Sequence, residues 1–398
     1  MVNIHAVAGL NFGDEGKGRY THWLSDEDST VIKHNGGAQA GHTVVTEDGA
    51  RIIHNQVGSG ASKGAETHLS DTFLVNPLFL LAEMDEFYSV FKRWPRISVH
   101  PNASVVFESD MFMNQMFETS RGKKRHGSCG HGINETVVRR EAGLNFTFGD
   151  LIRGEDVDSF VRNQLVPWYE RRAAANKLAA STEIAAAAAA KMQKLHEVVD
   201  RLRCLVTQRR SVDHRGRSKI IYESGQGIGL TQANMDEYPH LTRSDTDFTN
   251  VARDIKRRDY GTDVKLDVHL VTRPYVTRHG NGRLPFEVTD SCERYLPSFS
   301  DKTNVPNEWQ GSIRVGLLCD DAVKRYASAL DSVAVRGLAI SNTVAFTCMD
   351  HANSYFYGTG EMFNSDYESV LKLVHQKFDN TANVLTFRSE KYSDPDPV

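Results

Sequence analysis

Two glycine-rich loops near the start of the chain carry the side chains best suited to chemistry. The first is Gly13-Asp-Glu-Gly-Lys-Gly18 and the second is Gly36-Gly-Ala-Gln-Ala-Gly-His-Thr43, each after a short apolar run. A lysine among glycines is typical of a phosphate-binding loop, because backbone amides and an ammonium group both attract the anion. The carboxylates of the first loop and the histidine of the second add groups that can transfer protons. The two loops together predict phosphoryl transfer coupled to a proton transfer.

Asp14, Lys17 and His42 are the candidate reacting groups. Lys17 would neutralise charge on a transferring phosphoryl group, and Asp14 could bind Mg²⁺ or take a proton. His42 follows small residues and could stand in an open pocket as a general acid. The first loop is not a Walker motif, since it lacks the GxxxxGK spacing and a Ser or Thr after the lysine. The alternatives are a tight turn with solvated charges and a histidine with a structural role.

Two further loops offer contacts for a nucleotide. Residues 222–227 (YESGQG) follow a predicted strand and supply backbone amides together with the Gln226 amide. Residues 121–132 (RGKKRHGSCGHG) form a basic, glycine-rich stretch. A plain turn is the alternative for the first loop, and a solvated basic loop is the alternative for the second.

The composition is that of an ordinary soluble protein and argues against a disulfide-rich, secreted or membrane-spanning one. The 398 residues are 40% apolar and 25% charged, as in ordinary soluble proteins, and the net charge of −4 gives no drive toward nucleic acid or acidic membranes. Five scattered cysteines without a CxxC pair argue against a disulfide framework or zinc site and fit a reducing cytosol. No signal peptide is visible, and no apolar run approaches the roughly 18 residues that a membrane span needs. A cytoplasmic protein is expected.

The sequence predicts strands that alternate with helices, and the loops described above connect them. Strands are expected at 5–10, 30–33, 219–223, 264–271 and 338–348, which predicts an α/β fold with a largely parallel sheet and loops gathered at one end. Asn76 and Pro77 mark a helix start, and Asn134 is expected to cap a second helix through Arg140. Residues 166–205 are rich in Ala, Lys, Glu, Arg and Leu and predict one or two long helices. Residues 276–283 are expected to form a loop.

These motifs together resemble those of the adenylosuccinate synthetases, enzymes that join aspartate to IMP using GTP. GDEGKG, GGxxAGHT and the strand-end GQG agree in order and spacing, and the resemblance covers nearly the whole chain. Further agreement lies at 74–77, 149–151, 238–242, 277–278 and 285–286. The resemblance implies one α/β domain over residues 1–392 around a mostly parallel sheet, with a helical excursion at about 150–210 and a disordered tail at 393–398. It also implies an active homodimer.

The resemblance assigns roles residue by residue. It makes Asp14 the base and a Mg²⁺ ligand, His42 the acid, Lys17 the phosphate-loop lysine and Gly41 a backbone metal ligand. Gln39 stands where the family has an asparagine, and Cys129 stands where it has a phosphate-binding threonine. The residues expected to contact nucleotide or phosphate are Gly13, Glu15, Gly16, Gly18, Asn35, Gln39, Thr43, Ser128, Cys129, Arg139, Gln226, Thr242 and Asp350. Arg139 or Arg140 is expected to reach into the site of a partner subunit.

Two departures from the family pattern concern the substrates. The guanine-reading TKLD segment is replaced by Thr347-Cys-Met-Asp350, and the usual C-terminal GPxR segment is not recognisable. The arginine-rich aspartate loop is replaced by residues 301–314, which leaves Thr303, Asn304 and Arg314 as the expected aspartate contacts. These features resemble the bacteriophage branch, which makes N6-succino-2-amino-2′-deoxyadenylate from dGMP on the route to 2-aminoadenine DNA.

The function expected from the sequence is a ligase that joins L-aspartate to C6 of dGMP, with ATP or dATP as donor and Mg²⁺ as cofactor. No direct contact with nucleic acid or membrane is expected, and a phage-encoded enzyme would act in the host cytoplasm. One alternative is an ordinary adenylosuccinate synthetase that uses IMP and GTP. Another is a nucleotide-binding regulatory protein without catalysis. Retention of Asp14 and His42 argues against that last alternative, since a binder needs neither.

Overall fold

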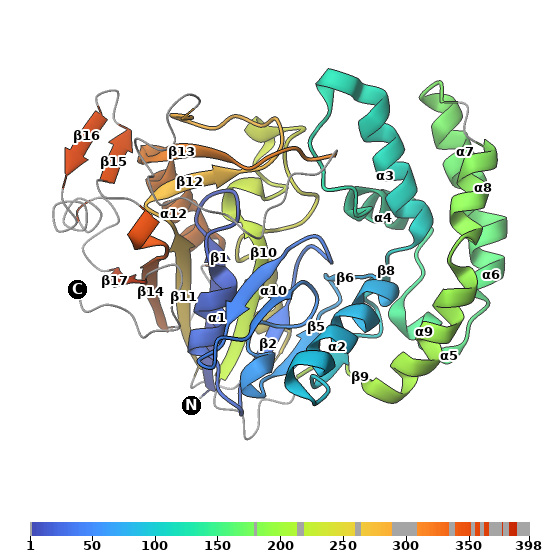
Figure 1. Ribbon diagram of the computed structural model, residues 1–398, viewed down its shortest axis with the longest axis horizontal. Helices are drawn as coiled ribbons and strands as arrows, with labels where there is room; N and C mark the ends of the chain where they lie inside the picture. The colour runs from blue at the N-terminus through green and yellow to red at the C-terminus, as the bar shows by residue number, and fades with distance from the viewer. Residues whose placement is uncertain are drawn as a thin grey trace.

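A parallel sheet runs through the part of the chain that the computed structural model describes, residues 2–178, 181–212, 219–258, 264–288, 309–333, 339–351, 355–358, 362–365, 376 and 382–387. Nine strands of these ranges form it in the order β17-β14-β11-β1-β10-β2-β5-β7-β9 (Figure 1). Their bounds are β1 Val2–Gly9, β2 Thr30–Lys33, β5 Glu66–Leu69, β7 Ile97–Val99, β9 Val206–Gln208, β10 Lys219–Gly227, β11 Val264–Thr272, β14 Ala339–Phe346 and β17 Asn383–Thr386. The α/β prediction is confirmed.

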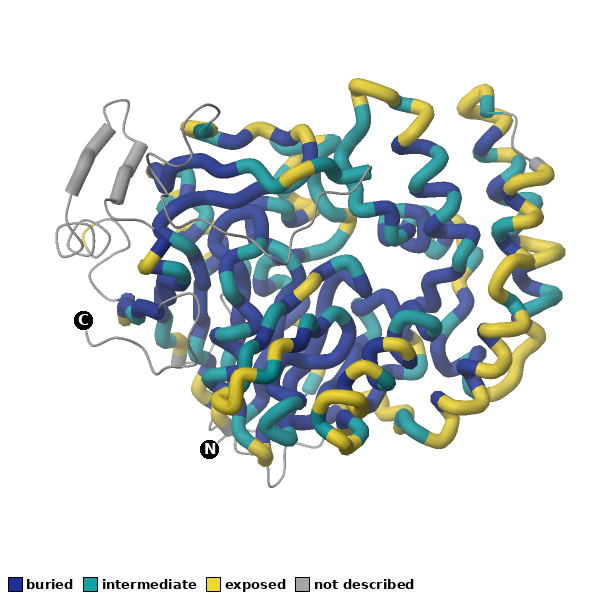
Figure 2. Tube along the Cα trace, viewed as in Figure 1, coloured by how far each residue is buried: buried dark blue, intermediate teal, exposed yellow. Residues whose placement is uncertain are grey.

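β1 lies in the interior of the sheet, between β11 and β10, and both of its faces are apolar. Ile4, Ala6 and Ala8 enter one core cluster, whereas Val7 enters a second cluster with Tyr20 of helix α1. Near-continuous apolar runs of this kind are typical of parallel strands covered on both faces. The strands at the centre are accordingly buried, and exposure is concentrated on the outer helices (Figure 2).

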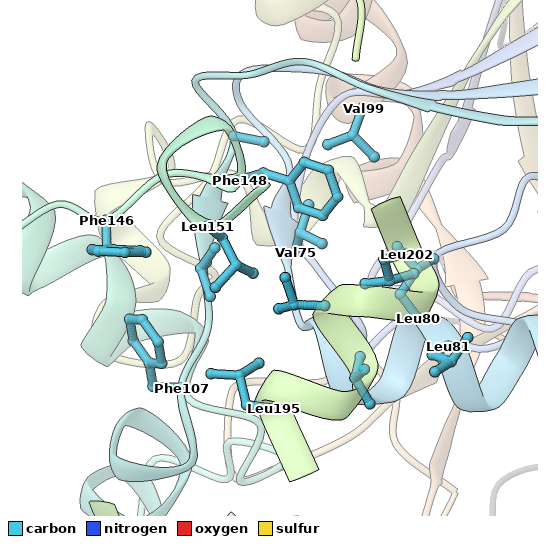
Figure 3. Close-up of a cluster of buried hydrophobic side chains, with 14 of the residues drawn as sticks. Val75, Leu80, Leu81, Val99, Phe107, Phe146, Phe148, Leu151, Leu195 and Leu202 are labelled. Carbon is cyan, nitrogen blue, oxygen red and sulfur yellow. The ribbon is translucent and has the colours of Figure 1, made fainter. Parts of the chain in front are cut away.

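The helices cover the sheet and extend it on one side. Their bounds are α1 Lys17–Leu24, α2 Pro77–Phe91, α3 Glu108–Arg121, α4 Ile133–Glu141, α5 Phe148–Arg153, α6 Val157–Phe160, α7 Val166–Ala175, α8 Ser181–Ala189, α9 Met192–Leu205, α10 Thr249–Arg257 and α12 Asp320–Val333. Helices α6 to α9 gather at one end of the molecule, beyond α3 and α4 (Figure 1). A second core joins this helical part to the sheet: Leu195 and Leu202 of α9 share one buried cluster with side chains of α2, α5 and β7 (Figure 3).

Three smaller sheets accompany the nine-stranded sheet in the described ranges. β3 (His42–Val45) and β4 (Arg51–His54) form an antiparallel hairpin, and β6 (Leu74–Val75) pairs with β8 (Ser104–Val105). A further sheet has the order β12-β13-β15-β16, with β12 at Tyr275–Arg278, β13 at Arg314–Cys319, β15 at Tyr355–Gly358 and β16 at Met362–Ser365. In the described ranges no helix has both the length and the apolar character needed to cross a membrane.

The ends of several helices and strands differ from those predicted by local sequence signals. The Asn76 side chain accepts the Phe79 amide at 3.1 Å and Pro77 opens α2, as predicted. Asn134 is not a cap, because Gly132 turns the chain with φ of 73° and α4 begins at Ile133. Residues 166–205 form three helices instead of one or two, since Lys177 adopts a left-handed φ of 59° after α7. Residues 276–283 are only partly a loop, because 276–278 pair with β13. The expected tail at 393–398 lies outside the described residues.

The strands β1, β2, β10, β11 and β14 run in parallel, so the segments that follow them meet at one edge of the sheet. Ligands of open α/β sheets bind at the carboxyl ends of the strands, close to the point where the strand order reverses. The two glycine-rich loops follow β1 and β2, the Gln226 segment ends β10, and Thr347 follows β14. The fold therefore brings segments more than 300 residues apart in sequence to one place.

Candidate active site

A cavity of about 360 Å³ lies between the loops at this sheet edge and helices α3 and α4. Ten of the residues singled out from the sequence line it: Gly13, Asp14, Lys17, Gln39, Gly41, His42, Ser128, Cys129, Gln226 and Thr242. Residues 238–243 and His279 complete the opposite wall. A concave site with a few convergent polar groups is the usual form of a small-molecule site.

The first glycine-rich loop is held in an unusual backbone conformation. Gly13 and Gly16 have φ of 122° and 85°, and Asp14 has φ of 60°, which is uncommon for a residue with a side chain. Two threonines fix the loop: Thr277 donates to the carbonyl oxygen of Gly13 and Thr347 donates to that of Glu15, each at 2.7 Å. Contacts from β12 and from the segment after β14 therefore maintain the conformation that aims Asp14 into the cavity.

Asp14 has a partner that the sequence reading did not single out. Oδ2 of Asp14 lies 3.1 Å from Nε2 of His279, just after β12. Burial favours the neutral acid, but the hydrogen bond and charge of His279, with Arg273 and Lys17, hold the pKa of Asp14 below its ordinary value. Asp14 is therefore a carboxylate at neutral pH and can accept a proton. Proximity to the recognised Thr277-Arg278 motif was the one sequence signal for His279.

Lys17 begins α1 and is almost fully buried, with Nζ 3.9 Å from Oε2 of Glu15. Burial lowers the pKa of Lys17 and raises that of Glu15, while each charge opposes the shift of the other. Glu15 is completely buried and accepts the Asn11 amide, so it supports the loop from beneath and does not line the cavity. Its expected nucleotide contact stays a prediction.

Glycines 16 and 18 serve the loop without lining the cavity. Gly16 occupies the N-cap of α1, where a side chain would collide with Thr347. A Cβ on Gly18 would lie 2.7 Å from Cβ of His42. Glycine at this position lets α1 pack against the start of β3, which brings Lys17 and His42 to the same cavity.

His42 is held by a buried carboxylate. Nδ1 of His42 lies 2.6 Å from Oε1 of Glu223, and Oε2 of Glu223 accepts the Ser59 amide at 3.1 Å. Nζ of Lys33 lies 3.6 Å from Oε2 of Glu223 and 3.3 Å from Nδ1 of His42. Nε2 of His42 is buried and has no hydrogen-bond partner among the described residues, so this nitrogen is available to a ligand in the cavity.

The charges around His42 set its protonation in the free protein. Burial and Lys33 lower the pKa of His42 to about 4, although Glu223 opposes them. Burial disfavours the Glu223 carboxylate, but Lys33, His42 and Ser59 hold its pKa well below the usual range. Glu223 was passed over in the sequence, yet it pairs in register with Lys33 where two adjacent parallel strands approach their glycine loops. The opposite charges of Lys33 and Glu223 at facing positions of two predicted strands were the sequence feature that pointed to Glu223.

Several of the expected nucleotide contacts line the cavity with polar side chains. The Gln39 amide is buried with no hydrogen-bond partner in the described part of the chain. Thr242 donates to the side-chain oxygen of Gln226, whose φ of 64° turns the β10 end toward the cavity. Ser128 accepts from Asn114 at 2.8 Å. Burial raises the pKa of the neighbouring Cys129 thiol to about 11, so it stays neutral.

Other expected contacts do not line the cavity. Asn35 exchanges two hydrogen bonds with the backbone of Gly225, at 2.8 and 3.0 Å, and so joins the ends of β2 and β10. Thr43 lies on the β3 hairpin, and Asp350 is exposed in a 3₁₀ turn after β14. None of these three residues lines the cavity, and their nucleotide contacts stay predictions.

Arg139 is completely buried, with Nε 2.9 Å from Oδ1 of Asp110 and Nη1 2.8 Å from the Leu144 carbonyl oxygen. Tyr169 also donates to this aspartate. The guanidinium group is therefore bound within the core, which argues against its expected role at the nucleotide or in a partner subunit. Arg140 is half-buried and remains the candidate for the second role.

Arg314 also binds groups within the protein. Its guanidinium binds both Glu287 oxygens, at 2.7 and 2.5 Å, and the carbonyl oxygens of Gly280 and Gly282, each at 2.7 Å. It does not line the cavity formed by the described residues, so its expected contact with aspartate stays a prediction that these bonds do not favour. The other two expected contacts, Thr303 and Asn304, lie outside the described residues.

The described residues contain no cluster of three or more His, Cys, Asp or Glu side chains arranged to hold a metal. The cavity does offer the Asp14 carboxylate and the backbone of Gly41. Oxygen donors in small number suit Mg²⁺, which is usually held by one or two carboxylates while substrate phosphates and water complete its shell. The residues present therefore fit a magnesium ion bound together with a nucleotide.

The chain is similar to a known family over most of its length. The family model described as adenylosuccinate synthetase matches residues 6–350. The adenylosuccinate synthetase of Vibrio vulnificus is 27% identical over 360 residues, 88% of this chain and 77% of the relative. That of Picrophilus torridus is 26% identical over 393 residues, 97% and 87% of the two chains.

Two solved structures share the fold at low sequence identity. Fully ligated adenylosuccinate synthetase from Plasmodium falciparum has a TM-score of 0.74 at 16% identity, covering 99% of each chain. Succinoaminodeoxyadenylate synthetase (PurZ) of cyanophage S-2L, bound to dGMP and to dATP as an energy donor, has a TM-score of 0.63 at 18% identity. It covers 100% of this chain and 95% of its own.

Proposed function

Because this chain belongs to the adenylosuccinate synthetase family of carbon–nitrogen ligases, we propose that it joins L-aspartate to C6 of dGMP with ATP or dATP as phosphoryl donor. The product is N6-succino-2-amino-2′-deoxyadenylate. The observation that carries the ligase chemistry is the placement of Asp14, Lys17 and the unpartnered Nε2 of His42 around one cavity.

The first half of the reaction activates C6. Guanine carries an N1–H beside a C6 carbonyl, and Asp14 removes the N1 proton. The resulting negative charge lets O6 attack the γ-phosphorus of the donor; the O6–P bond forms as the bond to the β-phosphate oxygen breaks. Lys17 and the amides at the start of α1 stabilise the charge on the transferring group.

The second half replaces the phosphate by an amine. The aspartate amine attacks C6, the C6–N bond forms and the C6–O bond breaks, so that inorganic phosphate leaves and the amine loses a proton. An anionic nucleotide near Nε2 of His42 favours the imidazolium form, and Glu223 at Nδ1 balances that charge. His42 then donates a hydrogen bond from Nε2 to the phosphoryl oxygens.

Asp14 and Gly41 are the proposed protein ligands of Mg²⁺, which supplies further neutralisation of the phosphates when bound. Thr303 and Asn304 remain the proposed aspartate contacts. We also propose a homodimer, with Arg140 as the residue that reaches the partner's site.

The substrate choice rests on the segment after β14. Met349 and Cys348 stand where the family has the leucine and lysine of its guanine-reading TKLD, so the lysine stem that would cover a guanine face is missing. The dGMP and dATP of the cyanophage neighbour support the same reading. The named curated relatives and the higher TM-score of the Plasmodium enzyme favour the second candidate, an adenylosuccinate synthetase that uses IMP and GTP.

A substrate matrix tests the proposal. The purified protein is incubated with aspartate, Mg²⁺ and each pairing of dGMP or IMP with ATP, dATP or GTP, and the succinylated product is identified by mass spectrometry. The proposal expects the fastest product formation from dGMP with an adenine nucleotide. Conversion of IMP with GTP alone would establish the second candidate instead.

A further inference from the structure

His279 contacts Asp14, the proposed base, and so lies one residue away from the reacting purine. Its Nε2 lies 3.1 Å from Oδ2 of Asp14, and both side chains line the cavity. We propose that His279 is a positioning residue that fixes the orientation of the Asp14 carboxylate for removal of the N1 proton. This inference rests on the proposed role of Asp14 as the base.

The strand that presents His279 is fixed on its N-terminal side. Thr277 donates to the carbonyl oxygen of Gly13 at 2.7 Å, so β12 and the Asp14 loop are joined directly. Arg278 is buried and donates to Glu237 at 2.7 Å and to the His240 carbonyl oxygen at 2.8 Å. The backbone just before His279 is therefore held by two side chains in succession.

The loop after His279 is fixed as well. Arg314 binds the carbonyl oxygens of Gly280 and Gly282 and is itself held by Glu287. Gly280 also packs so closely on Gly127 that a side chain on Gly127 would collide with it. Arg314, which does not face the cavity, thus acquires a role in holding the His279 loop.

The Asp14 carboxylate needs such a partner because other groups compete for it. Lys17 and Arg273 both attract its charge. A carboxylate turned toward either cation would no longer present an oxygen to N1. The hydrogen bond from His279 uses one lone pair of Oδ2 and leaves the other lone pairs of the carboxylate for N1 and for Mg²⁺. A neutral imidazole with its proton on Nε2 is sufficient to donate this bond. Misplacement of a reacting group by about 1 Å costs on the order of 100-fold in rate.

The test compares His279→Leu with His279→Gln, whose amide can donate from near the place of Nε2. The expected result for His279→Leu is a loss in kcat of about 100-fold with KM for the nucleotide changed less than about threefold. His279→Gln should keep kcat within about tenfold of the wild type. In His279→Ala, added imidazole should restore part of the lost rate, which a merely structural role would not permit. If His279→Leu does not fold, the inference is tested by two other results: the kcat of His279→Gln, and the restoration of activity to His279→Ala by imidazole.

The matched control is His196→Leu on α9. His196 also pairs with an aspartate, Asp158, at 2.8 Å, but the pair lies on the surface and away from the cavity. This variant should keep wild-type kcat, so that a general effect of losing a His–Asp pair is separated from the effect at Asp14.

Failure of this inference is distinguishable from failure of the proposed function. The variants are assayed on whichever purine monophosphate the wild type converts, so conversion of IMP alone removes the dGMP proposal and leaves the His279 test intact. A kcat of His279→Leu within about threefold of the wild type would overturn the inference, as would equal losses in the Leu and Gln variants. A crystal structure of His279→Leu with the Asp14 carboxylate unmoved would overturn it independently of turnover.

Discussion

Oε1 of Glu223 lies 2.6 Å from Nδ1 of His42 and so determines which ring nitrogen faces the cavity. With Nδ1 donating to the carboxylate, Nε2 is the nitrogen that meets a ligand. Lys33 balances the second oxygen of Glu223 at 3.6 Å. His42, Glu223 and Lys33 thus form a buried ionisable group in which Nε2 of His42 is free to bind a ligand.

Glu223→Gln should lower kcat by about two to three orders of magnitude, because it removes the charge that supports the His42 imidazolium. It should also destabilise the fold by about 3–5 kcal/mol, since Lys33 would be left as an unpaired buried charge. Rates and urea unfolding measure the two effects. The double variant Lys33→Met/Glu223→Gln should recover stability without recovering kcat. Recovery of both would assign Glu223 to stability alone.

Asp14→Asn should abolish turnover while dGMP binding, measured by calorimetry, stays within about tenfold of the wild type. The amide fills the same volume and can still pair with His279, but it cannot accept the N1 proton. Full activity of this variant would refute the assigned base. Nucleotide binding without turnover in the wild type as well would support the nucleotide-binding regulatory protein considered as an alternative.

The parallel sheet and the gathering of loops at one of its edges were predictable because apolar runs, glycine loops and their order are local in sequence. Asp14, Lys17 and His42 were predictable for the same reason. His279 was not, since its meaning depends on β12 lying beside the Asp14 loop, a contact across more than 260 residues. The partners of Arg139 and Arg314 were not predictable either, because the sequence does not show that a buried aspartate binds one guanidinium group and loop carbonyl oxygens bind the other.

Arg314→Met should lower kcat for the complete reaction without a selective rise in KM for aspartate, because Arg314 holds the His279 loop. Glu287→Gln should reproduce the direction of this change, since Glu287 orients the same guanidinium. Steady-state kinetics with aspartate and nucleotide varied separately make the comparison. A rise in aspartate KM of about 100-fold in Arg314→Met alone would restore the direct aspartate contact.

Arg139→Met should destabilise the protein by about 3–5 kcal/mol, because it leaves Asp110 buried without its cation. Nucleotide KM should change little in the folded fraction. Arg140→Met is the comparison: if Arg140 reaches a partner's nucleotide, this variant should raise nucleotide KM at little cost in stability. Urea unfolding and kinetics on both variants measure these effects, and the opposite pattern would return the intersubunit role to Arg139.

The last prediction concerns acid stability. Burial lowers the pKa of His34 to about 4 and that of His68 and His269 to about 3, against an ordinary value of 6.5. The unfolded chain therefore takes up protons below pH 6.5 that the folded chain refuses. The stability that these neutral histidines confer is complete above pH 6.5 and is lost as the pH falls toward 3–4.

For these three groups the free energy of unfolding should fall by up to about 4 kcal/mol per pH unit near pH 5. Glu15, whose pKa burial raises, acts in the opposite direction and reduces this slope. His269→Gln should lower the slope between pH 6.5 and 5 by about 1 kcal/mol per pH unit, because the amide can replace the bonds to His5 and Tyr20 but does not titrate. Urea unfolding at a series of pH values measures the slopes, with the exposed His196→Gln as control. An unchanged slope in His269→Gln would show that His269 gains its proton in the folded protein, contrary to its burial between β11 and α1.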